Sequence, residues 1–114
     1  MIKVFKNQEF GKIRIVEGTN SAIMFCATDV ATALGYSDAA KAIKQHCKKD
    51  GWAFYPVIDS MGRTQQAKFI SEGNLYRLIA SSHLPNAENF ESWIFDDVIP
   101  TIRKTGGYVN NDET

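Results

Sequence analysis

Three lysines that recur three and four residues apart are the side chains in this sequence with the clearest chemistry. Lys41, Lys44 and Lys48 share one flank if this segment is a helix, because residues at that spacing are neighbours on a helical surface. An ammonium group neutralises a phosphate as a point charge, so such a flank suits a nucleic-acid backbone. Gln45 has an amide that can pair with an adenine edge, and Lys49 adds one more charge.

Two interpretations of this lysine flank stay open. Amphipathic surface helices commonly carry lysines on their solvent side, where the charges only keep the protein soluble. Alternatively, this is the second helix of a helix-turn-helix-like unit and offers its lysines and Gln45 to DNA. The segment 25–50 has no arginine, the residue that recognises guanine through two hydrogen bonds. The spacing therefore favours affinity for DNA more than sequence specificity.

A shorter helix and a glycine turn must position the lysine helix. Thr28 and Asp29 are N-cap residue types, so we expect the first helix to begin there. Gly35 is expected to end it in the left-handed conformation, with the following tyrosine folded back. Ser37 or Asp38 can then cap the lysine helix. The apolar stripe expected to face inward on that helix consists of Ala39, Ala40, Ile43 and Cys47.

The segments around this unit predict an antiparallel sheet. Residues 2–5 and 12–16 have the pattern of a β-hairpin, and residues 22–25 that of a central strand. Residues 52–58 and 64–70 form a second predicted hairpin, separated by turn residues.

Alternation along the first hairpin predicts which side chains are buried. Ile13 and Ile15 should share the buried face, while Lys12 and Arg14 point outward. In the second hairpin, Pro56 should mark an edge position or a bulge, because proline cannot donate to a β-ladder.

Two further helices complete the predicted α+β fold. Ser71 is an N-cap type before a helix that should end near Ser81. Pro100 is expected to kink the last helix or to begin a new turn, and Gly106 with Gly107 to end it. The apolar stripe of that helix consists of Ala87, Phe90, Ile94 and Val98. We expect a small antiparallel sheet built from β-hairpins and packed with about four helices, including the helix-turn-helix-like pair.

The last helix is apolar over more of its circumference than one packing face needs. Phe95 and Ile99 fall on a flank beside the main stripe. A helix lodged deep in the core would bury both flanks, but nearby carboxylates argue against complete burial. We therefore expect Phe95 and Ile99 to be partly exposed and to pair across a two-fold homodimer.

Composition and charge bound the possible classes of protein. With 114 residues, 44% of them hydrophobic, the chain has the size of one domain with its own core. The formal net charge is +0, yet residues 1–49 carry eight Lys and Arg against four Asp and Glu. The remainder carries the compensating acidic excess, so a surface for a polyanion is expected in the first half.

The sequence offers no set of residues that predicts catalysis. Cys26, Cys47, His46 and His83 have no spacing typical of zinc sites, and no motif surrounds a candidate nucleophile. No catalytic residue, metal ion or cofactor is therefore expected, and no enzyme activity. No apolar run is long enough for a signal peptide or a membrane span, so we expect a reduced, cytoplasmic protein.

The order of motifs along the chain resembles the N-terminal domain of the BRO family, which includes phage and prophage antirepressors and the BRO proteins of large DNA viruses. The residues that carry this resemblance are Phe25, Asp29, Val30, Ala33, Leu34, Gly35, Tyr36, His46, Ile70, Ser71, Glu72, Leu75, Tyr76, Leu78, Ile79, Phe90, Trp93, Val98, Pro100, Ile102, Arg103, Lys104, Gly106 and Tyr108. The resemblance implies an α+β domain that binds DNA in a bacterial host, with a role in relieving repression in a phage switch.

The resemblance leaves two questions open. We expect residues 1–108 to form the domain and residues 109–114 to be a polar tail or the start of a linker, so the chain is either a short family member or an N-terminal piece. The partner of an antirepressor can be DNA, or it can be the phage repressor protein itself.

Overall fold

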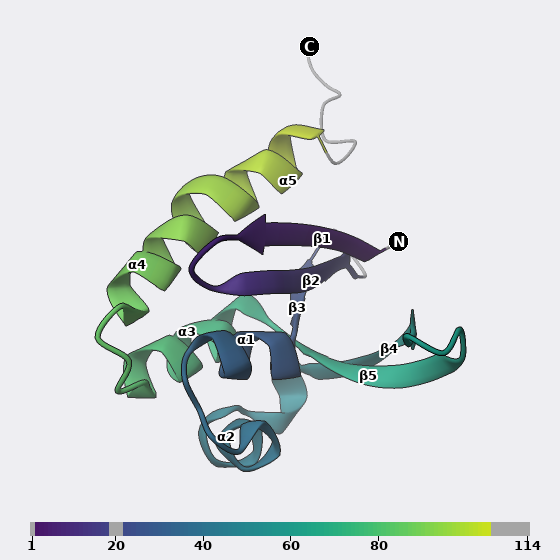
Figure 1. Cartoon of the computed structure of the whole chain (residues 1–114), viewed down its shortest axis with the longest axis horizontal. Coiled ribbons are helices and arrows are strands. Elements are labelled where there is room, and N and C mark those ends of the chain that lie inside the picture. Colours follow the sequence, from purple (N-terminus) through teal and green to yellow (C-terminus); the bar gives the residue numbers. More distant parts are fainter. Residues whose placement is uncertain (1, 19–21, 106–114) are drawn as a thin grey trace.

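The computed structural model describes residues 2–18 and 22–105 of the 114-residue chain (Figure 1). The elements are β1 (Ile2–Asn7), β2 (Gly11–Glu17), β3 (Ile23–Cys26), α1 (Ala27–Ala33), α2 (Ala39–His46), the 3-10 helix η2 (Lys49–Gly51), β4 (Trp52–Ile58), β5 (Thr64–Ile70), α3 (Glu72–Ser81), α4 (Ala87–Ser92), the π-helix η3 (Trp93–Val98) and α5 (Ile99–Thr105). This is an α+β fold, which confirms the prediction.

Antiparallel strands form one sheet in the order β1-β2-β3-β5-β4. Both predicted hairpins are present, and the strand predicted at residues 22–25 lies at the centre as β3. Pro56 lies opposite Gln66 on β4, which is an edge strand, as its lack of an amide hydrogen requires. α1 begins at the residue that follows β3, so the helical unit is connected directly to the central strand.

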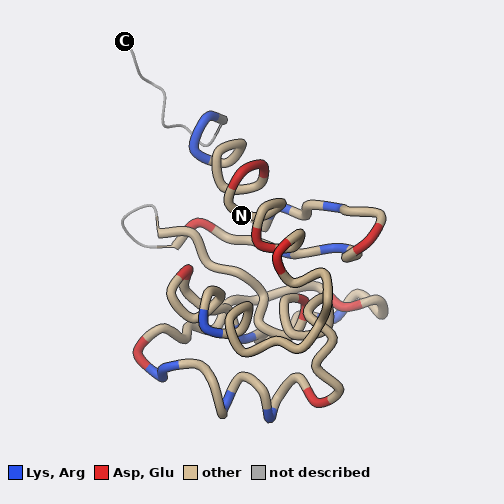
Figure 2. Tube along the Cα trace, turned by 90° about the vertical axis from the view of Figure 1, so that its left-hand side faces the viewer, with Lys and Arg blue, Asp and Glu red and all other residues tan. Residues whose placement is uncertain are grey.

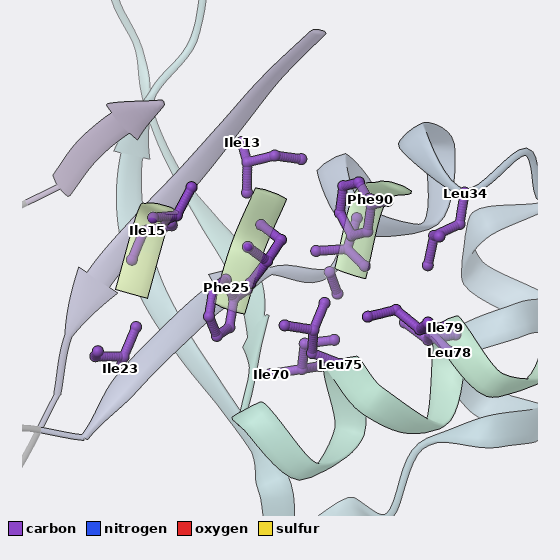
Figure 3. Close-up of a cluster of buried hydrophobic side chains, with 14 of the residues drawn as sticks. Ile13, Ile15, Ile23, Phe25, Leu34, Ile70, Leu75, Leu78, Ile79 and Phe90 are labelled. Carbon is purple, nitrogen blue, oxygen red and sulfur yellow. The ribbon is translucent and has the colours of Figure 1, made fainter. Parts of the chain in front are cut away.

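The main core lies between the sheet and the helices. Ile13 and Ile15 are 0% and 1% exposed, which confirms the face predicted for them. Figure 3 shows these two side chains and Phe25 beside Leu75 of α3 and Phe90 of α4. Burial of such large apolar side chains is the main favourable term in folding, at roughly 1.5–3 kcal/mol each. The core therefore holds α1, α3 and the last helix on the sheet together.

The sheet also has a smaller apolar cluster. Its buried members are Val16, Cys26, Val57 and Phe69. Burial raises the pKa of the Cys26 thiol, and its sulfur accepts a hydrogen bond from Arg14 Nη2 at 3.3 Å.

The last helix runs through residues 87–105 as α4, η3 and α5, along one side of the molecule (Figure 1). Pro100 has no amide hydrogen to donate back along the helix, and the wider π turn of η3 ends two residues before it. The helix is thus irregular just before Pro100, and the α-helical segment that contains Pro100 begins at Ile99. The helix end predicted at Gly106 and Gly107 lies outside the described residues, as does the tail after Tyr108.

The exposure predicted for Ile99 is wrong, because this side chain is only 3% exposed and belongs to the main core. A π turn holds more residues than an α turn, so it shifts the positions that follow it and brings Ile99 to the buried side with Val98 and Ile102. Phe95 is half-buried, and its ring meets that of Tyr76 edge to face at 6.0 Å.

The predicted start of α1 is also corrected. The helix begins at Ala27, with Cys26 at the N-cap and no side-chain cap, so Thr28 and Asp29 lie in its first turn. The carboxylate of Asp29 instead accepts two hydrogen bonds from the guanidinium of Arg14, at 2.8 and 2.9 Å, and one from the Arg14 backbone amide at 2.9 Å.

The alternation along β2 predicted that Arg14 points outward, but its side chain is not free in solvent. Its side chain is 35% exposed and lies over the start of α1, where its hydrogen bond to Asp29 raises the pKa of the guanidinium. A two-pronged contact between guanidinium and carboxylate fixes orientation as well as distance. It joins β2 to α1, which supports the lysine helix.

We predict that Asp29→Asn lowers the free energy of unfolding by about 1–2 kcal/mol, because it weakens charge-assisted hydrogen bonds in a half-buried site. Urea denaturation followed by circular dichroism measures the change. Glu72→Gln is the control, because its partner Arg103 is 58% exposed and such pairs contribute at most about 1 kcal/mol. Equal losses in the two variants would contradict the assignment.

Candidate nucleic-acid interface

The turn between α1 and α2 has the local chemistry that its sequence predicts. Gly35 has φ of 82°, and the Tyr36 amide donates to the Ala31 carbonyl at 3.0 Å, which closes the end of α1. Asp38 caps α2 by accepting a hydrogen bond from the Lys41 amide at 3.1 Å. Both predictions, the stop at Gly35 and a cap at Asp38, are confirmed.

Tyr36 fixes this turn to the rest of the fold. Its hydroxyl donates to the Leu78 carbonyl of α3 at 2.7 Å, and its ring lies 5.8 Å from that of His46.

The inward face of α2 differs in part from the predicted stripe. Ala42 and Ile43 are the buried residues, whereas Ala40 is exposed, because α2 packs against both α1 and α3.

The five residues proposed from spacing are all exposed on or just after α2. They are Lys41, Lys44, Gln45, Lys48 and Lys49. Figure 2 shows α2 at one end of the molecule, with blue lysine positions on its outer side. Within the described residues, none of these lysines forms an ion pair, whereas Arg14, Arg63 and Arg103 each do. We name these five residues the lysine surface.

A buried amide fixes the end of α2. Asn74 of α3 is 0% exposed, and its side chain binds both backbone groups of Lys48. Its Oδ1 accepts from the Lys48 amide at 2.8 Å, and its Nδ2 donates to the Lys48 carbonyl at 2.9 Å. Arg77 donates to the same Oδ1 at 2.9 Å. The direction in which the chain leaves α2 is therefore set by α3.

Sequence reasoning did not predict this role for Asn74. Asn74 is the third residue after the cap residue Ser71, where a capping box has Glu or Gln, so its type gives no local signal for a contact with α2. In the structure Ser71 caps α3 from its own side, by accepting from the Asn74 amide at 3.3 Å, which confirms the predicted cap. The Asn74 side chain does not bond back to the cap, so it is available for Lys48.

Gly51 lets the segment that carries Lys49 lie against α3. Its carbonyl accepts from the Ser71 amide at 3.0 Å. A Cβ added to Gly51 would lie 2.7 Å from the Ser71 hydroxyl and closer still to the Asn74 amide. Because real Cβ atoms do not approach other atoms so closely, glycine is the residue that fits here. Lys48 and Lys49 thus lie in a segment that is bound to α3 through Asn74 at its start and to Ser71 through Gly51 at its end.

Two more cations lie near the end of α2. Burial raises the pKa of the half-buried Cys47 thiol to about 11, and the positive charges of Arg77 and Lys68 oppose that rise. Arg77 also donates to the Asn74 side chain that binds Lys48. The Lys68 ammonium is 3.6 Å from the centre of the Trp52 ring, a cation–π contact.

A depression of about 370 Å³ lies beside the N-terminal half of the lysine surface. Its lining consists of Tyr36, Ser37, Asp38, Lys41, Ala42, Gln45, His46, Ser81 and His83. Among the residues that the structure describes, no three His, Cys, Asp or Glu side chains are grouped so that they could hold a metal ion. No helix in the described ranges is long and apolar enough to span a membrane.

The fold and this surface define a small α+β domain with a helix-turn-helix-like pair. The family model of the BRO family, N-terminal domain, matches residues 12–100. An uncharacterized protein of Haemophilus influenzae is 43% identical over 96 residues, which cover 84% of this chain and 47% of that protein. The putative Bro-N domain-containing protein 289L of Invertebrate iridescent virus 6 is 34% identical over 125 residues, covering 95% of this chain and 30% of that protein.

These matches establish that the chain belongs to the BRO family through its N-terminal domain. The chain spans less than half the length of these curated relatives. No solved structure gives a significant match.

We predict that Asn74→Ala lowers the free energy of unfolding by about 1–3 kcal/mol, because it leaves the Lys48 amide without its partner and leaves the Lys48 carbonyl with the Gly51 amide alone. Urea denaturation measures the loss. Hydrogen exchange of the Lys48 amide should become faster than in the unaltered domain, and this increase should exceed the increase at other amides. Asn89→Ala is the matched control, since Asn89 is exposed on α4. Unchanged exchange at Lys48 would show that the Asn74 side chain does not hold this segment.

Proposed function

We propose that this domain is the DNA-binding module of a transcription regulator of the phage antirepressor type. The observation that carries the proposal is the lysine surface, which places four lysines without ion-pair partners among the described residues along one exposed helix and its end. Phosphate contacts by such cations supply most of the affinity for DNA, independent of sequence.

The way that α2 is held supports this proposal. α1 packs against α2 and is itself joined to the sheet through Arg14 and Asp29, as the first helix of a helix-turn-helix unit supports the second. Gln45 is the exposed side chain of α2 whose amide suits the edge of an adenine. We assign backbone contacts to Lys41, Lys44, Lys48 and Lys49, and base contact to Gln45.

A second candidate function is the capture of a phage repressor protein. A different surface favours it: a pocket of about 510 Å³ between α3 and the last helix, lined by Glu72, Gly73, Tyr76, Glu91 and Phe95. Tyr76 is 52% exposed, and exposed aromatic side chains are typical of protein interfaces. Phe95 is also the member of the proposed dimer pair that retains exposed surface, since Ile99 is buried.

We predict that Lys41→Ala, Lys44→Ala and Lys48→Ala each weaken binding to random-sequence duplex DNA. Each should also lower the slope of log affinity against log salt by about 0.9, because one counterion release is lost. Electrophoretic shifts from 50 to 200 mM salt measure both quantities.

The matched control is a triple variant of the same charge, Lys6→Ala with Lys12→Ala and Lys104→Ala, all exposed and far from α2 in the sequence. It should bind DNA more tightly than the variant in which Lys41, Lys44 and Lys48 are all replaced by alanine. If the two triple variants bind alike, α2 is not the DNA surface. Pull-down of the repressor from the same genetic element by a domain that does not shift DNA would favour the second candidate.

A further inference from the structure

The β4–β5 hairpin presents an aromatic and cationic face beside the lysine surface. Trp52 and Phe54 are two residues apart on β4, so they lie on the same side of the strand. Phe54 is paired in register with Lys68 of β5 and is 59% exposed. We name Trp52, Phe54 and Lys68 the hairpin face.

The ammonium of Lys68 lies against the Trp52 ring and near the Phe54 ring. It lies 3.6 Å from the centre of the Trp52 ring and 5.8 Å from that of Phe54. A lysine side chain normally loses considerable conformational freedom when it binds a partner. Here the contact with Trp52 already restricts it, and the donors directed away from the ring can reach a phosphate oxygen. Within the described chain, no carboxylate pairs with Lys68.

The hairpin face adjoins the lysine surface through the chain and through space. Trp52 directly follows η2, the short helix that carries Lys49. Cys47, at the end of α2, and Trp52, whose ring lies against the Lys68 ammonium, both pack against the main core. Figure 1 shows the hairpin beginning beside α1 and extending away from the helices. One polyanion could therefore contact both.

We infer that the hairpin face is a second contact site for the same duplex DNA, an inference that rests on the proposed function. Lys68 contacts a phosphate of the backbone next to α2, and the Phe54 ring packs against the adjacent deoxyribose and base edges. Duplex DNA fits this face because each anionic phosphate is flanked by deoxyriboses, whose carbon atoms can contact an aromatic ring. An acidic protein segment would match the charge of Lys68 alone.

Two single substitutions separate the charge from the ring. Lys68→Gln should weaken duplex binding and lower the salt slope by about 0.9. Phe54→Thr removes the ring and introduces a β-branched residue that suits a strand, and it should weaken binding by about 5-fold or more without changing the salt slope. The control is Met61→Ser, which removes an apolar side chain that is 74% exposed in the turn of the same hairpin. It should bind DNA as the unaltered domain does.

Tryptophan fluorescence gives an independent measurement. The chain has two tryptophans, so Trp93→Phe leaves Trp52 as the reporter. Addition of duplex DNA should change its emission, with the same midpoint as the electrophoretic shift. Circular dichroism on each variant verifies that the fold is kept.

The outcomes distinguish this inference from the proposed function. A domain that binds no duplex at low salt overturns both. If substitution of the lysines of α2 weakens binding but Phe54→Thr and Lys68→Gln both bind like the unaltered domain, only the hairpin inference is overturned. Unchanged Trp52 emission on saturation with DNA also overturns it.

Discussion

The proposed binding surface depends on one buried side chain, the amide of Asn74. The Asn74 side chain both donates to and accepts from the backbone of Lys48, so it holds that residue much as a neighbouring strand would. Because Asn74 is fully buried, water cannot replace either hydrogen bond without opening the core. This contact therefore fixes the position of three consecutive segments relative to α3: the end of α2, η2 and the start of β4. Gly51 is part of the same constraint, since a side chain there would collide with Asn74 and Ser71.

Charges in this fold fall into two groups with different roles. The arginines at positions 14, 63 and 103 have carboxylate partners, and the first of these pairs joins the sheet to α1. The lysines of α2 are exposed and form no ion pair among the described residues. Unpaired exposed lysines contribute little to stability, but they retain their full attraction for a polyanion. A net charge of +0 therefore conceals a cationic end of the molecule.

The last helix shows how a backbone irregularity changes which residues are buried. A regular helix would place Ile99 on a flank of its own, which is the basis of the exposure predicted from the sequence. The π turn before Pro100 instead brings Ile99 into the core, while Phe95 stays half-buried against Tyr76. The aromatic pocket between α3 and the last helix and the lysine surface on α2 thus involve different side chains, so the two candidate functions can be tested separately.

The sequence by itself determined the features that depend on neighbouring residues. The hairpins, the central strand, the stop at Gly35 and the caps at Asp38 and Ser71 all follow from alternation and from turn or cap residue types. Exposure of the lysines of α2 followed from helical spacing, although the inward stripe was wrong at Ala40. Only the tertiary structure decided the contacts that fix the site: Asn74 to Lys48 across 26 positions, Arg14 to Asp29 across 15, and Lys68 against Trp52. Local patterns cannot encode these contacts, because each depends on how separate elements pack around the common core.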